Sequence, residues 1–265
     1  MEFFSSLEAI LTSVKPEIKI AKFNEFFECY KTNKTTFKHN QESVVFSSPS
    51  YSEHLNVVHA KKLSKRSKLG SIEGKAYLCH SVAHIEYSAI DLALDTAYRF
   101  KNQPKEFYDD WIDVANDEIR HFLSLEKLLV KYGYTYGSFD VHSFLFETSM
   151  RCLDIVSRIA VVPRYLEASG LDSSPKVIAK LGNINDEFAK ELKQSIEIIL
   201  KEEVSHVKKG DFWFKYFCEQ KGIDPKSYFD IVETVLPGAK KKKPYVNVSA
   251  RLKSGFTQEE IDVLI

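Results

Sequence analysis

Two copies of one short motif constrain this sequence more than any other feature. The motif acid-Glu-x-x-His occurs as DEIRH, which ends at His121, and as EEVSH, which ends at His206. On an α-helix, residues three positions apart lie about 60° apart around the axis, so the Glu and the His of each copy face the same way. Each pair can therefore bind one metal ion. Because Glu118 and Glu203 are 85 residues apart, the two copies indicate the two halves of one binuclear site.

Helical patterning surrounds both copies. The expected segments are a helix over 75–102, a helix from Pro104 to Tyr132, a long connection over 134–145 and renewed helix from 147 to about 220. Proline is favourable in the first turn of a helix, and Gly133 supplies a left-handed stop. Long helices with one long crossover describe a ferritin-type four-helix bundle, so the predicted fold class is all-α.

The two ends of the chain are expected to add to this bundle. Residues 1–35 predict one or two short amphipathic helices, and residues 36–70 predict an extended arm laid over the core. After a short helix at Asp224-Pro225, the tail reads as a basic run, an extended segment and a last helical turn or two. The predicted organisation is therefore 1–70, 71–220 and 221–265.

A binuclear site of this type also needs one carboxylate from each of the other two helices. Glu86 is the only acidic residue in residues 75–90 of the first helix, so it is the candidate there. Glu167 is the candidate on the third helix. Glu86 lies 17 residues before position 103 and Glu118 lies 15 after it, a mismatch of roughly 3 Å along the helices. These two residues are therefore expected at the same depth.

The same test chooses the loop that joins the last two helices. A loop at 172–175 would place Glu167 and Glu203 about 36 Å apart in depth, which excludes a shared site. A loop at 182–185 leaves 17 and 19 residues on its two sides, counted from position 184. We therefore expect one helix over 147–182, kinked or locally unwound at Pro163 and Pro175.

The predicted metal ligands are all hard oxygen or imidazole donors. They are Glu86, Glu118, His121, Glu167, Glu203 and His206. Carboxylates can bridge two ions, imidazole suits iron, manganese and zinc, and four Glu balance the charge of two divalent ions. Asp117 and Glu202 each precede a His by four residues and could ligate, but we favour a role in orienting the histidines.

Several other side chains are candidates for parts of a site. His80 and His84 could form a surface metal pair, although His84 points about 160° away from Glu86 around the helix. Tyr87 and Tyr165 neighbour predicted ligands and could act in redox chemistry or hydrogen bonding, but core packing is the simpler interpretation. The two tryptophans, Trp111 and Trp213, are expected in the core or at an interface.

These motifs resemble those of the ferritin-like di-iron carboxylate superfamily. The Asp-Glu-x-Arg-His form is similar to the ligand motif of bacterial multicomponent monooxygenases. The stretch KLGSIEGKAYLCHSVAHIEYSAIDLALDTAYRF, with EIRH, LEASGLD and EEVSHVKKG, is closer still to a bacterial family of ferritin-like proteins known only as a domain of unknown function. The likeness covers roughly residues 65–220, with a weaker one in the tail segment VNVSARLKSGF. It implies a helical bundle with a di-metal site and implies no substrate.

The function expected from these residues is that of a non-haem di-iron, or manganese–iron, oxidoreductase that uses O2 as an oxidase or hydroxylase. The alternatives are an iron-handling or peroxide-scavenging protein of ferritin or rubrerythrin type, and a non-catalytic scaffold stabilised by metal. The cofactor is expected to be two metal ions, iron first, with manganese or a mixed pair as alternatives. No Walker or Rossmann fingerprint is present, so electrons would come from an external donor.

Composition narrows the partners. The charges of the 37 basic and 37 acidic residues cancel, so the formal net charge is zero. A neutral chain argues against a nucleic-acid or membrane partner. The four lysines Lys240–Lys243 leave a weak possibility of tRNA contact, with a solvated linker as the simpler interpretation. No signal peptide, membrane span or C-x-x-C motif is present, so a cytoplasmic protein with reduced cysteines is expected, with a small-molecule substrate and a homodimer as open possibilities.

Overall fold

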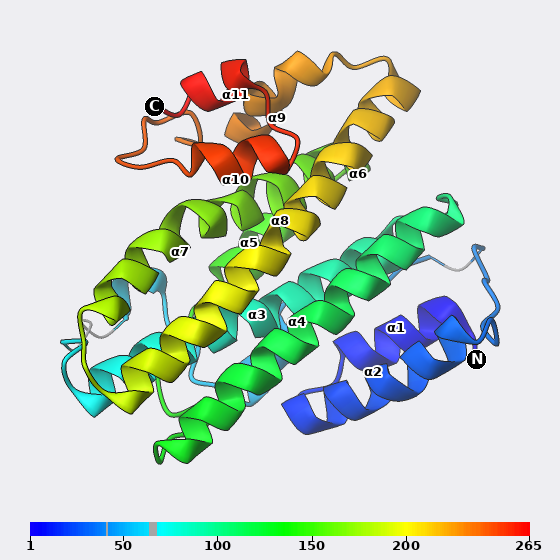
Figure 1. The fold of residues 1–265 in the computed structure, drawn as a ribbon. Helices are drawn as coiled ribbons and strands as arrows, with labels where there is room; N and C mark the ends of the chain where they lie inside the picture. The colour runs from blue at the N-terminus through cyan, green and yellow to red at the C-terminus, as the bar shows by residue number, and fades with distance from the viewer. Residues whose placement is uncertain (41, 64–67) are drawn as a thin grey trace. The chain divides into compact units, whose positions relative to one another are not determined.

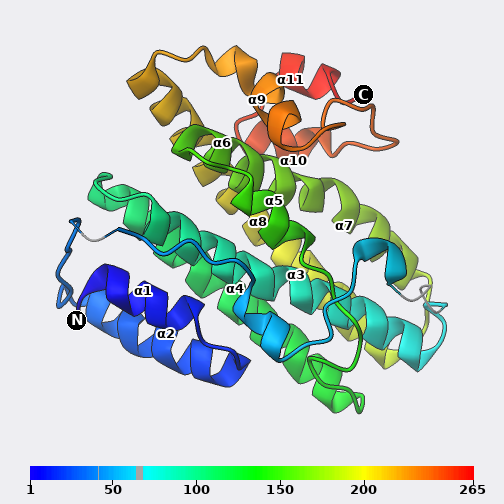
Figure 2. The same ribbon diagram turned by 180° about the vertical axis from the view of Figure 1, so that it is seen from behind.

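The computed structural model describes residues 1–40, 42–63 and 68–265, and their regular structure is helical (Figures 1 and 2). Within these ranges the β-type pairing consists of two isolated bridges, Glu2 with Thr36 and Val57 with Val141. The chain is an all-α helical-bundle protein, as predicted. It forms two compact units, one of residues 1–67 and 76–146 and one of residues 68–75 and 147–265.

The first unit begins with two short helices, α1 (Phe3–Leu11) and α2 (Pro16–Lys31). They confirm the prediction for residues 1–35. The apolar residues of α1 recur at helical spacing and are buried, and Phe3 packs edge-on against Phe26 of α2 with ring centroids 5.5 Å apart. Pro16 starts α2 at a position where its missing N–H costs no hydrogen bond.

Two long helices, α3 (Ile72–Arg99) and α4 (Lys105–Lys131), lie side by side in this unit (Figure 1). They run antiparallel, because Cys79 donates to the carbonyl of Leu125 at 3.5 Å, whereas Tyr87, farther along α3, packs against Phe122, which comes earlier on α4, with ring centroids 5.0 Å apart. Pro104 caps the start of α4, and Gly133 follows its end with a φ of +82°. The predicted loop and stop signal are therefore confirmed, and they set which residues of α3 and α4 face each other.

The segment between α2 and α3 is an arm with little helix, as predicted. It contains only the short turns η1 (Ser50–Glu53) and η2 (Ala60–Lys62) among its described residues. Lys19 of α2 is fully buried beneath it, donates to the Ser50 hydroxyl at 3.0 Å and forms an ion pair with Asp91 of α3. A polar contact buried in this way ties α2, the arm and α3 together.

In the second unit, the helix expected over 147–182 is present only in part. The short helix α5 (Phe144–Met150) covers only its first residues, and residues 151–154 interrupt the helix. Asp154 then starts a new run with a capping box. This run consists of α6 (Ile155–Ile159), the π-helix η3 (Ala160–Leu166) and α7 (Glu167–Gly182). The sequence prediction was wrong about the start because it missed the cap at Asp154.

The two prolines in this run behave differently. Pro163 lies inside the π-helix, so the expected unwinding is present there. At Pro175 the expected interruption is absent and α7 continues. Proline provides no N–H for the carbonyl one turn earlier, which belongs to Leu171. That carbonyl accepts from the side-chain amide of Asn247 at 3.2 Å, so a residue far along the chain satisfies it.

The longest helix, α8 (Glu187–Lys221), packs against η3 and α7. Asp186 caps its start and Gly222 ends it in the left-handed conformation. The turn between α7 and α8 follows Gly182, as predicted, and so the two helices form an antiparallel hairpin. The Pro163 backbone lies against Gly210, close enough that an added Cβ would meet it at 2.9 Å.

The chain ends in short helices of the second unit. These are the turn η4 (Pro225–Ser227), α9 (Tyr228–Val235), α10 (Val248–Lys253) and α11 (Gln258–Asp262). The helix after Asp224-Pro225 and the last helical turns were predicted. Helix α10 was not, because the segment VNVSARL reads as extended, and its signal was Asn247, whose side chain accepts from the N–H of Ala250.

Candidate metal centre

Helix α4 places Glu118 and His121 together in the interior of the first unit. Their side chains are 1% and 2% exposed, and His121 Nδ1 lies 3.3 Å from Glu118 Oε2. The i, i+3 spacing brings them to the same face of the helix, as the motif requires. A carboxylate and an imidazole buried this deeply, one turn apart, form half of a metal-binding set.

Glu86 reaches the same group from α3. Its Oε2 lies 3.1 Å from His121 Nδ1, and its side chain is 6% exposed. One possible ligand atom of each of these three side chains lies within 4.8 Å of those of the others. Because α3 and α4 are antiparallel, Glu86 and His121 lie at nearly the same distance from their connecting loop, which is the depth argument made from the sequence.

The electrostatics of this cluster favour a cation between the carboxylates. Burial by itself lowers the His121 pKa, but hydrogen bonds to Glu118 and Glu86 and their negative charges outweigh it and raise the pKa to about 11. At neutral pH His121 therefore holds a proton in the place where a cation would sit. A metal ion that entered would displace that proton, because only the neutral imidazole can be a ligand.

The donor set fits a metal ion chemically. Glu86, Glu118 and His121 offer two carboxylates and one imidazole, the ligand types that iron, manganese and zinc share. Two buried carboxylates at this separation repel each other unless a proton or a cation lies between them. The first unit therefore contains a cluster that could hold a metal ion.

The second motif lies on α8 in the second unit. Glu203 and His206 are both buried, and His206 Nδ1 lies 3.4 Å from Glu203 Oε1. The arrangement repeats that of Glu118 and His121, one turn apart on a single helix face. The second unit thus holds a matching carboxylate and imidazole.

Glu167 is the first residue of α7, directly after the π-helix, and is half-buried. Pro163, four residues earlier in the chain, lies against Gly210 of α8. Glu167 therefore begins the helix that pairs with α8, just after this close approach. A role for Glu167 as a ligand beside His206 stays a prediction.

The two predicted orienting acids lie at the edges of the motifs. Asp117 is half-buried and forms an ion pair with Arg120 at 2.5 Å. Glu202 is half-buried on α8. Their role in orienting histidines stays a prediction.

The idea of a surface metal pair at His80 and His84 is wrong, because both side chains are buried. The Gly137 N–H donates to His80 Nε2 at 2.9 Å, and the two ring nitrogens of His84 lie 2.8 Å from the Tyr136 hydroxyl and 3.0 Å from the His142 carbonyl. Burial lowers the pKa of each imidazole to about 4, so both are neutral at physiological pH. The two histidines fasten the 134–143 connection to α3.

The aromatic side chains singled out in the sequence are core residues. Trp111 and Trp213 are buried, as expected, and so is Tyr87, whose ring contacts Phe122. Tyr165 donates its hydroxyl proton to the carbonyl of Ala239 at 3.1 Å. Core packing therefore accounts for their positions.

The tail lysines contact the protein itself. Lys240 pairs with Asp230, Lys242 donates to the Asp262 carbonyl at 3.0 Å, and Lys243 pairs with Asp172 at 3.0 Å. These contacts occupy charges that would otherwise face a polyanion. The weak prediction of tRNA contact gains no support from them and stays a prediction.

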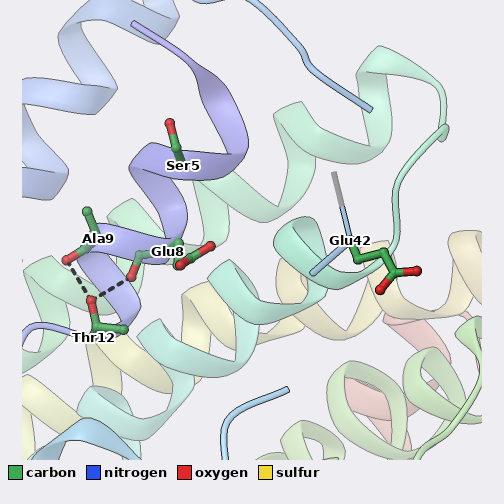
Figure 3. A pocket seen from close by; sticks show the side chains of 5 residues that line it. All are labelled: Ser5, Glu8, Ala9, Thr12 and Glu42. Carbon is green, nitrogen blue, oxygen red and sulfur yellow. Dashed lines mark hydrogen bonds between the residues drawn. The ribbon is translucent and has the colours of Figure 1, made fainter. Parts of the chain in front are cut away.

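A shallow hollow on the first unit contains none of the predicted ligands. Figure 3 shows its lining, which is Ser5, Glu8, Ala9, Thr12 and Glu42. Thr12 uses its hydroxyl to donate to backbone carbonyls of its own helix, and Glu8 accepts from Tyr98 at 2.6 Å. We assign no function to this hollow.

Comparison with known proteins identifies a family. A family described as "Protein of unknown function (DUF455)" matches residues 12–262. An uncharacterised protein of Haemophilus influenzae is 31% identical over 277 residues, covering 98% of this chain and 93% of the relative. No solved structure matches. In the part of the chain that the structure describes, no helix has the length and apolar composition needed to cross a bilayer.

Proposed function

Because the chain belongs to the DUF455 family of proteins of unknown function, we propose its activity from the chemistry of its buried ligands. The protein is a non-haem di-iron, or manganese–iron, oxidoreductase that uses O2 to oxidise or hydroxylate a small molecule. It is a member of the ferritin-like di-iron carboxylate superfamily, which the resemblance of its motifs supports.

One observation carries this proposal. Glu86, Glu118 and His121 form a buried cluster of two carboxylates and an imidazole around one position. Clusters of this kind are costly without a cation and are retained where function requires them. The repeated spacing of Glu203 and His206, also buried, supports a second and equivalent half.

In the proposed centre, the two halves combine to hold two metal ions. Glu118 with His121 would hold one ion and Glu203 with His206 the other, while Glu86 and Glu167 would be terminal or bridging ligands. When bound, a pair of iron ions supplies redox chemistry that amino-acid side chains lack. The side chains of the protein fix the ligand geometry and exclude bulk water, which strengthens the electrostatic interactions among the carboxylates, the imidazoles and the ions.

Oxygen consumption tests the proposal. Protein loaded with Fe2+ under anaerobic conditions is mixed with O2, and oxygen uptake is followed beside an equal concentration of free Fe2+. We expect the wild type to consume O2 faster than free Fe2+, and the double variant Glu118→Ala/Glu203→Ala to show no excess. The control Glu106→Ala/Glu197→Ala changes exposed acids on the same two helices and should match the wild type.

Other outcomes support the alternatives. Uptake no faster than that of free Fe2+, with metal still bound, would contradict an O2-using enzyme and favour a metal-stabilised scaffold. Assembly into a large cage that stores many iron ions per chain, measured by light scattering and iron content, would favour iron storage. O2 uptake that depends on an added small molecule would support the proposed enzyme, and the external electron donor would then be sought.

A further inference from the structure

Arg164 is a fully buried charge at the end of the π-helix. Its guanidinium lies over the ring of Tyr228, 3.8 Å from the centroid, and within 4.5 Å of the Phe256 centroid. It donates from Nε to Asp211 of α8 at 3.0 Å. It also donates from one nitrogen to both carboxylate oxygens of Glu260 at 2.8 and 2.9 Å. The π-helix, α8 and α11 therefore meet at one side chain.

A second buried arginine attaches the same tail to α7. Arg251 of α10 makes a bidentate pair with Asp172, with distances of 3.0 and 2.7 Å. The Asn247 N–H donates to the same carboxylate at 3.0 Å, and these donors lower the Asp172 pKa although burial alone would raise it. Together with Lys243, which pairs with Asp172, they make residues 243–262 a strap over η3 and α7, here called the C-terminal clamp.

The C-terminal clamp contacts the π-helix η3, a conformation that is uncommon in proteins. π-Helices occur mostly as short segments inside α-helices, often at functional sites. Here Pro163 lacks an N–H, and Gly210 allows the backbone of α8 to come close to it. Arg164, bonded to Asp211 and Glu260, fixes the last turn. Glu167 follows Arg164 by three residues and is the first residue after the π-helix. The conformation at the end of the π-helix therefore sets the direction of the Glu167 side chain.

We propose that the C-terminal clamp positions Glu167 as a metal ligand. In this proposal Arg164 and Glu260 are positioning residues that keep residues 160–166 in the π-helical conformation. This inference rests on the proposed function, because it gives Glu167 a place in the metal centre. It makes the tail part of the site without any tail residue touching the metal. It also predicts that loss of the clamp lowers the binding affinity for one metal ion and leaves the affinity for the other unchanged.

A Co2+ titration of the full-length metal-free chain, followed by visible absorption, tests this inference. The wild type should bind two ions per chain. Glu260→Gln should weaken the binding of one of them by about 10-fold, the lower end of the effect of losing a direct partner of a ligand, because Glu260 acts through Arg164. The absorption bands of that ion should change. Glu259→Gln, an exposed acid beside it on α11, should leave both unchanged. In a Glu167→Gln background, Glu260→Gln should have no further effect, because it acts through Glu167.

The outcomes separate the two proposals. Two ions bound equally well by wild type and Glu260→Gln would overturn the clamp and leave the metal centre standing. A further loss in the Glu167→Gln background would also overturn it, since the effect would then be general destabilisation. No Co2+ bound by the wild type would overturn the proposed function and the clamp with it. If circular dichroism shows that Glu260→Gln is unfolded, Glu260→Asp replaces it, with a smaller weakening of the same ion expected.

Discussion

At the scale of residues, His121 is the group whose state depends most on a bound ion. Its contacts with Glu86 and Glu118 at 3.1 and 3.3 Å place a charge between two buried carboxylates. In the metal-free protein that charge is a proton, since the pKa lies near 11, above the ordinary value of 6.5. A folded-state pKa raised in this way stabilises the metal-free protein fully below pH 6.5, and this contribution is lost as the pH rises toward 11.

Metal binding should therefore release the His121 proton. Near pH 7.5, uptake of a divalent ion should expel about one proton from this imidazole, and affinity should rise by up to tenfold per pH unit below the pKa. Titration calorimetry in buffers of different ionisation enthalpy measures the number of protons released. His121→Gln should release one proton fewer than the wild type, and an equal number from both proteins would contradict the assigned protonation.

Only part of this residue-level arrangement was visible in the sequence. Glu86, Glu118 and His121 could be chosen because helical spacing and equal distance from a loop fix which side chains meet. The buried pairs Arg164 with Glu260 and Arg251 with Asp172 could not, because a lone arginine in a sequence has the pattern of a solvated one. Nothing local distinguishes a charge buried by a distant segment from one left in water.

At the scale of elements, the hairpin of α7 and α8 depends on one close approach. Gly210 carries no side chain where the Pro163 carbonyl carbon and oxygen would lie 2.9 and 3.0 Å from an added Cβ. The loop at 182–185 followed from the sequence because only that loop gives Glu167 and Glu203 the same depth, and the unwinding at Pro163 followed because proline acts locally. The uninterrupted α7 at Pro175 did not, because its compensating donor, Asn247, is 72 residues away.

Two glycine variants test this packing. Gly210→Ala should lower the free energy of unfolding by about 1–3 kcal/mol, because Pro163 is rigid and its backbone has to move. Gly170→Ala, in α7 with nothing within 4 Å of the added Cβ, should raise it by about 0.5–1 kcal/mol through helix propensity. Urea unfolding followed by circular dichroism measures both. Equal effects of the two substitutions would contradict a special approach at Gly210.

At the scale of the whole molecule, metal content decides whether the repeated motif is a binuclear centre. The Glu-x-x-His pairs at Glu118 and Glu203 were the strongest signal in the sequence, and both pairs are buried in the folded chain. A site of four carboxylates and two imidazoles should be filled when the protein folds in cells that supply iron, and bound metal should raise the melting temperature.

The most direct measurement is elemental analysis of protein purified from iron-supplemented cells. The wild type is expected to carry about two iron or manganese ions per chain, a value set by the paired ligand sets. Glu118→Ala/Glu203→Ala should lose them, while Glu106→Ala/Glu197→Ala keeps them. No metal in the wild type, or equal metal in the wild type and the ligand variant, would contradict the di-metal centre.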